Sequence, residues 1–135
     1  MPHLQFETTV RLSPADKRAF ADRVTELYAD HMGTGTGHVA VTVRTYPNGG
    51  LTLGRLDPDE PAVVLNADVR RGRPFDRRRA FVRAAFAAAS DRWNVPTANS
   101  YAVVTEHDGR AFHEDDRVLA SWDEAEAEGG ARSEE

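Results

Sequence analysis

The stretch AVVLNADVRRGRPFDRRRAFVRAAFAAASDRWNVPTANSYAVVT, residues 62–105, decides the fold. It opens with the apolar run 62–65, passes through a long alanine-rich segment at 75–93, and closes with a second strand-like run at 100–105. Short apolar runs are typical of buried strands, whereas a segment of this length with an apolar face is typical of a helix. Residues 62–105 therefore predict a strand-helix-strand unit.

The preceding part of the chain shows the same pattern. Residues 2–8 predict a strand, and Ser13 and Pro14 are a capping residue and a first helical residue for a helix that ends at Gly33. A second strand follows, because valine alternates with other residues at Val39, Val41 and Val43. The turn 47–50 leads into Leu51, Thr52 and Leu53, which predicts a short hairpin.

The chain is therefore expected to hold two tandem β-α-β units, at about 2–46 and 62–105. Such units favour right-handed crossovers, so we predict an α/β (α+β) fold in which two helices cover one face of a four-stranded sheet. Residues 2–120 form the single domain that a 135-residue chain allows. Residues 121–135 hold six of the 22 acidic residues and one of the 17 basic ones, and we predict that this acidic tail is disordered.

Composition excludes several classes of function. Without cysteine the chain has no disulfides, no thiolate metal site and no cysteine nucleophile, and its five histidines do not fall at a zinc spacing. We expect no metal and no cofactor. Outside the tail, acids and bases balance, so the general positive field of a nucleic-acid-binding protein is missing. No apolar run is long enough to span a membrane and no signal peptide is recognisable, so a cytoplasmic protein without membrane contact is expected.

Pro2 is the first candidate for chemistry. Aminopeptidases remove an initiator methionine when the next side chain is small, and removal of Met1 would expose a secondary amine on Pro2. In a partly dry pocket beside arginines, burial and like charge would both lower the pKa of that amine. It could then act as a general acid or base, or attack a carbonyl.

Arginines supply the second candidate feature. Arg70 and Arg73 lie on the loop that follows the third main strand, and two guanidinium groups on one turn suit a small carboxylate. We interpret Arg77, Arg78 and Arg79, on successive helical positions, as a solvated basic face.

Together with Glu114, these features resemble the tautomerase superfamily, in particular its cis-3-chloroacrylic acid dehalogenase group. The resemblance covers roughly residues 2–119 and includes the Arg70-x-Gly72-Arg73 loop. It implies a tautomerase/MIF-like fold and a homotrimer whose sites are closed by neighbouring subunits. It also implies that Pro2 is the acid or base, that Arg70 and Arg73 hold a substrate carboxylate, and that Glu114 activates water.

Two positions depart from the dehalogenase pattern. Tyr28 stands where those enzymes have a histidine, and Val103 where they have a tyrosine. Tyr28 can still donate a hydrogen bond, and Tyr101 lies on the same strand face as Val103, so both are candidate substrate-binding residues. We therefore expect keto-enol tautomerisation or hydration of a small unsaturated or keto acid, ahead of dehalogenase-type lyase activity. The alternatives are iminium chemistry on Pro2, such as decarboxylation or carbon-carbon bond formation, and a non-catalytic module that binds a small anion or a protein.

Overall fold

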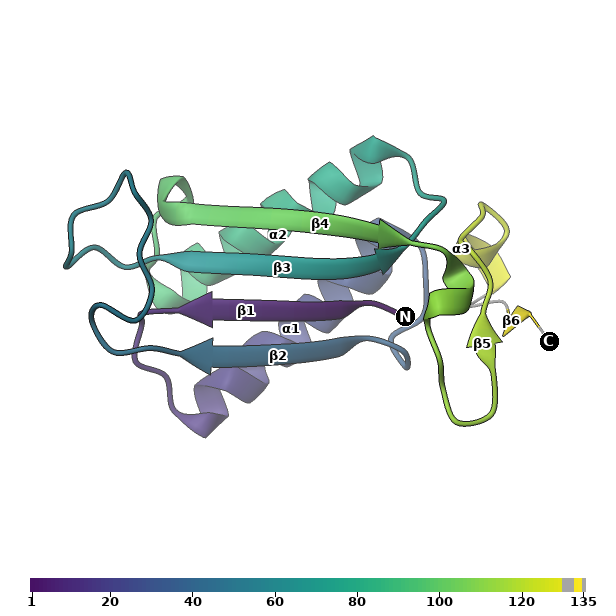
Figure 1. The fold of residues 1–135 in the computed structure, drawn as a ribbon, viewed down its shortest axis with the longest axis horizontal. Coiled ribbons are helices and arrows are strands. Elements are labelled where there is room, and N and C mark those ends of the chain that lie inside the picture. Colours follow the sequence, from purple (N-terminus) through teal and green to yellow (C-terminus); the bar gives the residue numbers. More distant parts are fainter. Residues whose placement is uncertain (130–132, 135) are drawn as a thin grey trace.

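The structure is a computed structural model that describes residues 1–129 and 133–134. Two β-α-β units follow one another along the chain, and a short C-terminal region comes after them (Figure 1). The first unit is β1 (His3–Thr8), α1 (Pro14–Met32) and β2 (Ala40–Thr45). The second is β3 (Val63–Arg70), α2 (Phe75–Trp93), the 3₁₀ turn η1 (Thr97–Asn99) and β4 (Ser100–His107). The remaining elements are η2 (Gly109–Ala111), β5 (Val118–Leu119), α3 (Glu126–Gly129) and β6 (Ser133–Glu134).

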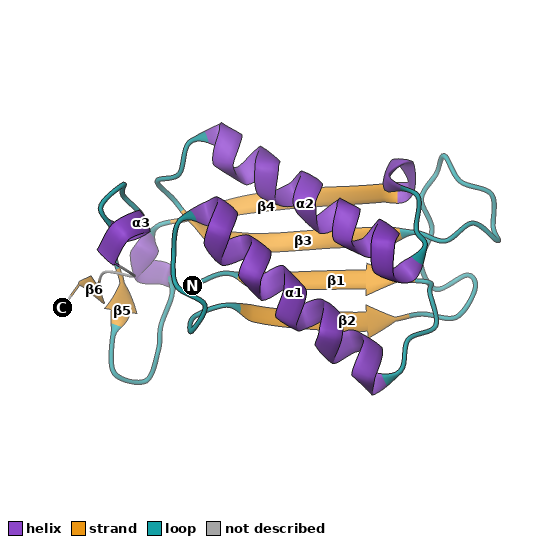
Figure 2. Ribbon diagram, turned by 180° about the vertical axis from the view of Figure 1, so that it is seen from behind, coloured by secondary structure: helices purple, strands orange, loops and turns teal. Residues whose placement is uncertain are grey.

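The main sheet has the strand order β2-β1-β3-β4, and both helices lie on one of its faces, as Figure 2 shows. Within each unit the two strands are parallel, whereas the central pair β1 and β3 is antiparallel. The predicted fold class and the predicted sheet are confirmed. Because β1 and β3 run in opposite directions, the start of β1 and the end of β3 lie at the same edge of the sheet, with His3 opposite Asp68.

Both helices begin and end where local chemistry dictates. Ser13 caps α1 through a reciprocal capping box with Asp16, and Gly33 ends the helix in the left-handed conformation. Asn94 ends α2 in the same conformation.

The core lies between the helices and the sheet. Phe20 of α1 packs edge-on against Phe6 of β1, and its ring also lies against Trp93 of α2. Tyr28 of α1 likewise packs edge-on against Phe81 of α2. These apolar contacts fix how the two units face one another, and therefore fix the edge at which Pro2 and Arg70 meet.

Two predictions from the sequence are wrong. Residues 51–53 form no strand, because a second turn, in which the Leu56 amide donates to the Leu53 carbonyl at 3.0 Å, follows too closely for a hairpin arm to form. The acidic segment is also ordered as far as the described residues reach: Trp122 and Glu126 are buried, and α3 is helical. The predicted disorder at 130–132 and 135 lies outside the described residues.

Candidate active site

The N-terminus is partly buried, with Met1 half-exposed and Pro2 buried. Pro2, Leu4 and Phe6 are all buried and alternate with half-buried residues, which places the Pro2 ring on the helix-covered face of the sheet. The Pro2 carbonyl accepts a hydrogen bond from the Ala40 amide at 3.1 Å, so β2 holds the residue in register. The chain is thus anchored at its first residues.

In this structure the free amine belongs to Met1, so the nitrogen of Pro2 is part of a peptide bond. Burial, followed by the charges of Arg70 and Arg73, lowers the pKa of the Met1 amine from 8.0 to about 5, against the opposing influence of Glu126 and Glu114. Two guanidinium groups and two carboxylates therefore lie within electrostatic reach of the N-terminal amine. Loss of Met1 would move the free amine back by one residue, about 3.8 Å along the chain.

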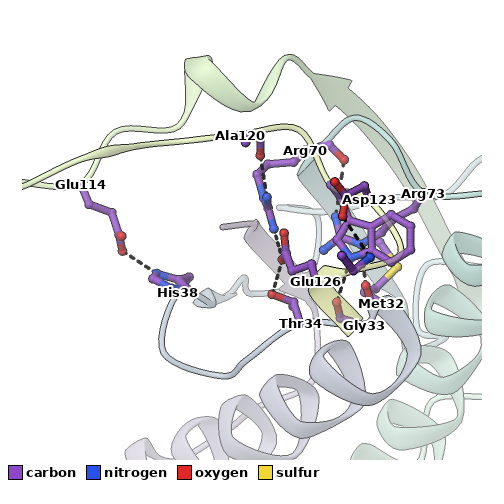
Figure 3. Close-up of polar contacts among 12 residues, drawn as sticks. Met32, Gly33, Thr34, His38, Arg70, Arg73, Glu114, Ala120, Asp123 and Glu126 are labelled. Atoms are coloured by element: carbon purple, nitrogen blue, oxygen red, sulfur yellow. Dashed lines mark hydrogen bonds and ion pairs between the residues drawn. The ribbon is translucent and has the colours of Figure 1, made fainter. Parts of the chain in front are cut away.

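Arg70 is the last residue of β3 and is completely buried. One of its terminal nitrogens donates to the Ala120 carbonyl at 2.6 Å, and the other forms an ion pair and hydrogen bond with the Glu126 carboxylate. The same carboxylate oxygen accepts from the Thr34 hydroxyl at 2.7 Å, so Glu126 lies between Arg70 and the loop after α1 (Figure 3). Burial acts to raise the pKa of Glu126, but the hydrogen bonds from Arg70 and Thr34 outweigh it and hold that pKa below its usual value.

Arg73 has only 4% of its surface exposed, and it lies against two aromatic rings. Its guanidinium carbon is 5.5 Å from the centre of the Tyr28 ring and 5.3 Å from that of Trp122, while its Nε donates to the Met32 carbonyl at 2.7 Å. Among the described residues its Nη2 has no hydrogen-bond partner. One terminal nitrogen of this guanidinium is therefore buried with its hydrogen-bonding capacity unused among the described residues.

Tyr28 is also a donor without a partner. Its hydroxyl is buried and bonds to none of the described residues, and burial raises its pKa to about 12. The hydroxyl is therefore protonated at neutral pH and can donate to a bound ligand. Tyr28 also lies beside Arg73, one of the two arginines.

A glycine at position 72 allows the C-terminal segment to cross the arginine loop, residues 70–73. Gly72 has a φ of +126°, and a Cβ there would lie 2.0 Å from the Trp122 carbonyl oxygen. The Trp122 amide donates to the Arg71 carbonyl at 2.9 Å, and its indole donates to the Gly33 carbonyl at 2.8 Å. Trp122 thus ties the arginine loop to the end of α1.

Glu114 belongs to a second polar group, which Figure 3 shows apart from Arg70 and Arg73. One carboxylate oxygen bonds to Nδ1 of His38 at 2.8 Å, and the other accepts from Nε of Arg117 at 3.1 Å. Arg117 also donates to Nε2 of His38 at 2.7 Å, so the ring proton must sit on Nδ1, facing Glu114. The hydrogen bond from His38, followed by that from Arg117, lowers the pKa of Glu114 despite some burial.

The basic helix face is only partly solvated, which corrects the sequence-based interpretation. Arg77 donates to the His31 carbonyl at 3.1 Å and lies over the Trp122 ring, and Arg78 forms a 3.0 Å ion pair with Glu106. Arg79 is exposed, as expected. Residues at successive helical positions point in different directions, and two of these three side chains, those of Arg77 and Arg78, contact other parts of the protein.

Tyr101 does not join the other candidates within one chain. It pairs in register with Val64, near the start of β4. Thr105, near the other end of β4, pairs with Asp68, which in turn lies opposite His3 at the N-terminus. Tyr101 and Val103 are 49% and 45% exposed, on the sheet face opposite α1 and α2. A role for Tyr101 would therefore require another copy of the chain.

Sequence reasoning missed three contributors to this region: Glu126, Trp122 and His38. The first two fall in the segment expected to be disordered. A tryptophan among acids and alanines was the available signal, since a large aromatic side chain is seldom left in water. His38 gave no signal, because its partner Glu114 is 76 residues away in the sequence.

Among the described residues, no helix is both long and apolar enough to cross a membrane. In the same part of the chain, histidines and carboxylates do not gather in threes as metal ligands would.

No protein-family model matches the chain, and no curated protein matches it. Solved structures do. The chain is similar to Pt0534 inactivated by 2-oxo-3-pentynoate, with a TM-score of 0.75, 16% identity, and coverage of 84% of this chain and 91% of that one. It is also similar to N1, a member of the cis-3-chloroacrylic acid dehalogenase family, with a TM-score of 0.74, 23% identity, and coverage of 87% and 84%.

A third similar structure is the macrophage migration inhibitory factor of Toxoplasma gondii, with a TM-score of 0.73, 19% identity, and coverage of 87% of this chain and 99% of that one. All three are tautomerase-superfamily structures. The fold that the sequence resemblance implies is therefore confirmed: this chain has the tautomerase-superfamily fold, over most of its length and most of theirs.

Proposed function

We propose that the chain is an enzyme that uses the amine of Pro2, exposed by loss of Met1, as a general acid and base on a small carboxylate-bearing keto or unsaturated acid. The proposed reactions are keto-enol tautomerisation and hydration. The observation that carries the proposal is the N-terminal amine, half-enclosed at the sheet edge with two guanidinium groups near enough to depress its pKa. The fold of the solved tautomerases and dehalogenases agrees with it.

The low pKa of the Met1 amine supports the catalytic role. An amine on Pro2, exposed by loss of Met1, would lie near the same Arg70 and Arg73 and would be neutral near pH 7, so its nitrogen lone pair would be free to take a proton. In tautomerisation, Pro2 would remove a proton from the carbon next to a carbonyl. The carbon-hydrogen electrons would form the enolate double bond, and the Pro2 ammonium would return the proton to the enolate oxygen or to another carbon.

The remaining residues have proposed roles in binding. Arg73, with one nitrogen unpaired among the described residues, and Tyr28, with a buried free hydroxyl, would bind the substrate carboxylate and carbonyl. Arg70 would bind the carboxylate as well. Glu114, kept ionised by His38 and Arg117, would orient a water molecule for addition to a double bond.

The exposed sheet face supports a homotrimer as the working form. Tyr101 and Val103 lie on that face, and a neighbouring copy that covers it would bring its Tyr101 to a site that one chain does not reach. The proposed partners are thus a small carboxylate substrate and two further copies of the chain.

The direct test is proton NMR in deuterium oxide of the processed protein with enol acids, unsaturated acids and acetylenic acids. Deuterium exchange, hydration and decarboxylation each give a distinct product. The Pro2→Ala variant is the matched control, and we expect it to lose nearly all turnover. Full activity in Pro2→Ala would refute the role of Pro2, and trapping of substrate on Pro2 by cyanoborohydride would favour iminium chemistry instead.

A further inference from the structure

The position that a substrate carboxylate would take on Arg70 is already filled by a carboxylate of the chain itself. Glu126 approaches one terminal nitrogen of Arg70, and the side chains of both residues are fully buried. Arg73 is also 96% covered. A substrate carboxylate therefore cannot reach Arg70 while Glu126 is in place.

We propose that Glu126 is a built-in competitor for the substrate carboxylate, which must displace it from Arg70 for anionic substrates to bind. The inference rests on the proposed function, because it takes Arg70 to be part of the substrate site. It makes Glu126 a specificity-determining residue. Displacement of Glu126 would weaken the binding of anionic substrates. It would not weaken the binding of a neutral carbonyl compound that reaches Pro2 without contacting Arg70.

The chemistry of the exchange limits the cost of displacement. A carboxylate on Arg70 replaces a carboxylate on Arg70, so the buried guanidinium is never left without a counter-ion, which is the costly state. Glu126 gives up its hydrogen bonds with Arg70 and Thr34 on leaving. Water then solvates its second carboxylate oxygen, which is buried without a hydrogen-bond partner among the described residues.

The proposal requires the segment that carries Glu126 to turn outward about Trp122. Trp122 is held by two hydrogen bonds and by the Arg73 and Arg77 guanidinium groups over its ring. Between Trp122 and Glu126, Glu124 and Ala125 are exposed, and Asp123 is half-buried. Outward movement of Glu126 would break the hydrogen bond from its amide to the Asp123 carbonyl, at 3.1 Å, and would leave the contacts of Trp122 in place.

Two reactive ketones of equal length test the proposal. 2-Oxo-3-pentynoate carries a carboxylate, whereas 3-pentyn-2-one has a methyl group at that position. With either compound the Pro2 nitrogen would add to the triple bond, and a nitrogen-carbon bond would replace one π bond. The neighbouring carbon would take a proton from solvent and the nitrogen would release its own proton to solvent, which completes the enaminone. The adduct contains the whole reagent, so intact mass and peptide mapping report its site and rate.

The processed wild type is compared with Glu126→Gln, which keeps the shape but removes the charge, and with Glu124→Gln as the matched control. Glu124 lies on the same segment, with a side chain that is 72% exposed. We expect Glu126→Gln to label Pro2 with the anionic ketone about tenfold faster at low reagent concentration, because more of the protein is competent to bind it. Labelling by the neutral ketone should change less than twofold, and Glu124→Gln should match the wild type with both.

If Pro2 is labelled but Glu126→Gln reacts with the anionic ketone no faster than wild type, the competitor role is wrong. An equal acceleration with both ketones also overturns it, because Glu126 would then act as a steric cover. Absence of labelling in every variant would instead refute the proposed function. Should Glu126→Gln fail to fold, Thr34→Val removes one hydrogen bond to Glu126 and should give a smaller acceleration, confined to the anionic ketone.

Discussion

The two β-α-β units share one fold but bring opposite ends of their first strands to the site. The first unit contributes the start of β1, where the N-terminal amine lies, and the second contributes the end of β3, where Arg70 lies. They meet because β1 and β3 are antiparallel neighbours in the sheet. A duplicated architecture thus produces an asymmetric candidate site, with the proposed proton-transfer group from one unit and the proposed anion-binding groups from the other.

Blocking the contribution of the first unit should have the largest effect. An N-terminal extension that leaves a residue in front of Pro2 turns its nitrogen into an amide, whose lone pair is delocalised into the carbonyl and does not take up a proton near neutral pH. We expect turnover in the NMR assay to fall by about 10³-fold, within the usual range for loss of a general acid-base group. Unchanged turnover by the extended protein, with its blocked end verified by intact mass, would exclude Pro2 from the chemistry.

The second unit depends on a close backbone crossing, which Gly72→Ala would break. A Cβ at Gly72 would meet the Trp122 carbonyl at 2.0 Å, and φ there is +126°. We expect the free energy of unfolding, from denaturant titration, to fall by about 2–4 kcal/mol.

Gly49→Ala is the matched control for that change. Gly49 also has a positive φ, of +90°, but an added Cβ would meet nothing within 4 Å. Its cost should be limited to backbone strain, about 1 kcal/mol. Equal costs at the two glycines would show that the contact between the arginine loop and Trp122 contributes nothing to stability.

Loss of His38 should change the ionisation of Glu114. His38→Ala removes the hydrogen bond that is the largest cause of its lowered pKa, so the pKa should rise towards the ordinary 4.5. A carboxyl with a depressed folded pKa stabilises the protein above its ordinary pKa, and loses that contribution as the pH falls through the lowered value. In the variant the carboxyl should protonate at a higher pH, seen in a ¹³C NMR titration.

The same variant should slow hydration by about tenfold to a hundredfold, because the carboxylate loses its orientation. Tautomerisation, which needs no water, should slow much less. If both reactions slow equally, Glu114 has no special part in hydration.

The smallest effect is expected at the helix caps, where the units also differ. Ser13 caps α1 through its side chain, whereas Pro74 at the start of α2 makes no such hydrogen bond. Ser13→Ala should lower the free energy of unfolding by about 1 kcal/mol. Asp22→Ala, an exposed change later in α1, is the control, and a cost at Ser13 no larger than at Asp22 would contradict the capping role.

Local patterns were enough to predict most of the fold. The capping serine, the valine alternation and the alanine-rich helix each report structure within a few residues, and the observed strands and helices follow them. The hairpin at 51–53 failed because two turns compete for three residues. The packing of Trp122 and Glu126 could not be predicted, because it depends on Gly33, Thr34 and Gly72, which are 50 to 92 residues away in the sequence.

The proximity of the candidate site residues was predictable to the same extent. Pro2, Arg70, Arg73 and Tyr28 gather at one edge because the strand order brings them there, and the strand order follows from the tandem units. The residues that pair with these side chains were not predictable in this way. The carboxylate that occupies Arg70 comes from a segment with an ordinary acidic composition, in which nothing distinguishes Glu126 from Glu124 or Glu128 until the chain is folded.

The most direct measurement is the titration of the Pro2 nitrogen itself, by ¹⁵N NMR of processed protein labelled at proline. The account predicts that Pro2 titrates well below the ordinary pKa of an α-amine, about 8, and that Arg73→Gln raises this pKa because one of the two nearby positive charges is lost. A Pro2 amine that titrates in the ordinary range, and does not respond to Arg73→Gln, would contradict the central claim.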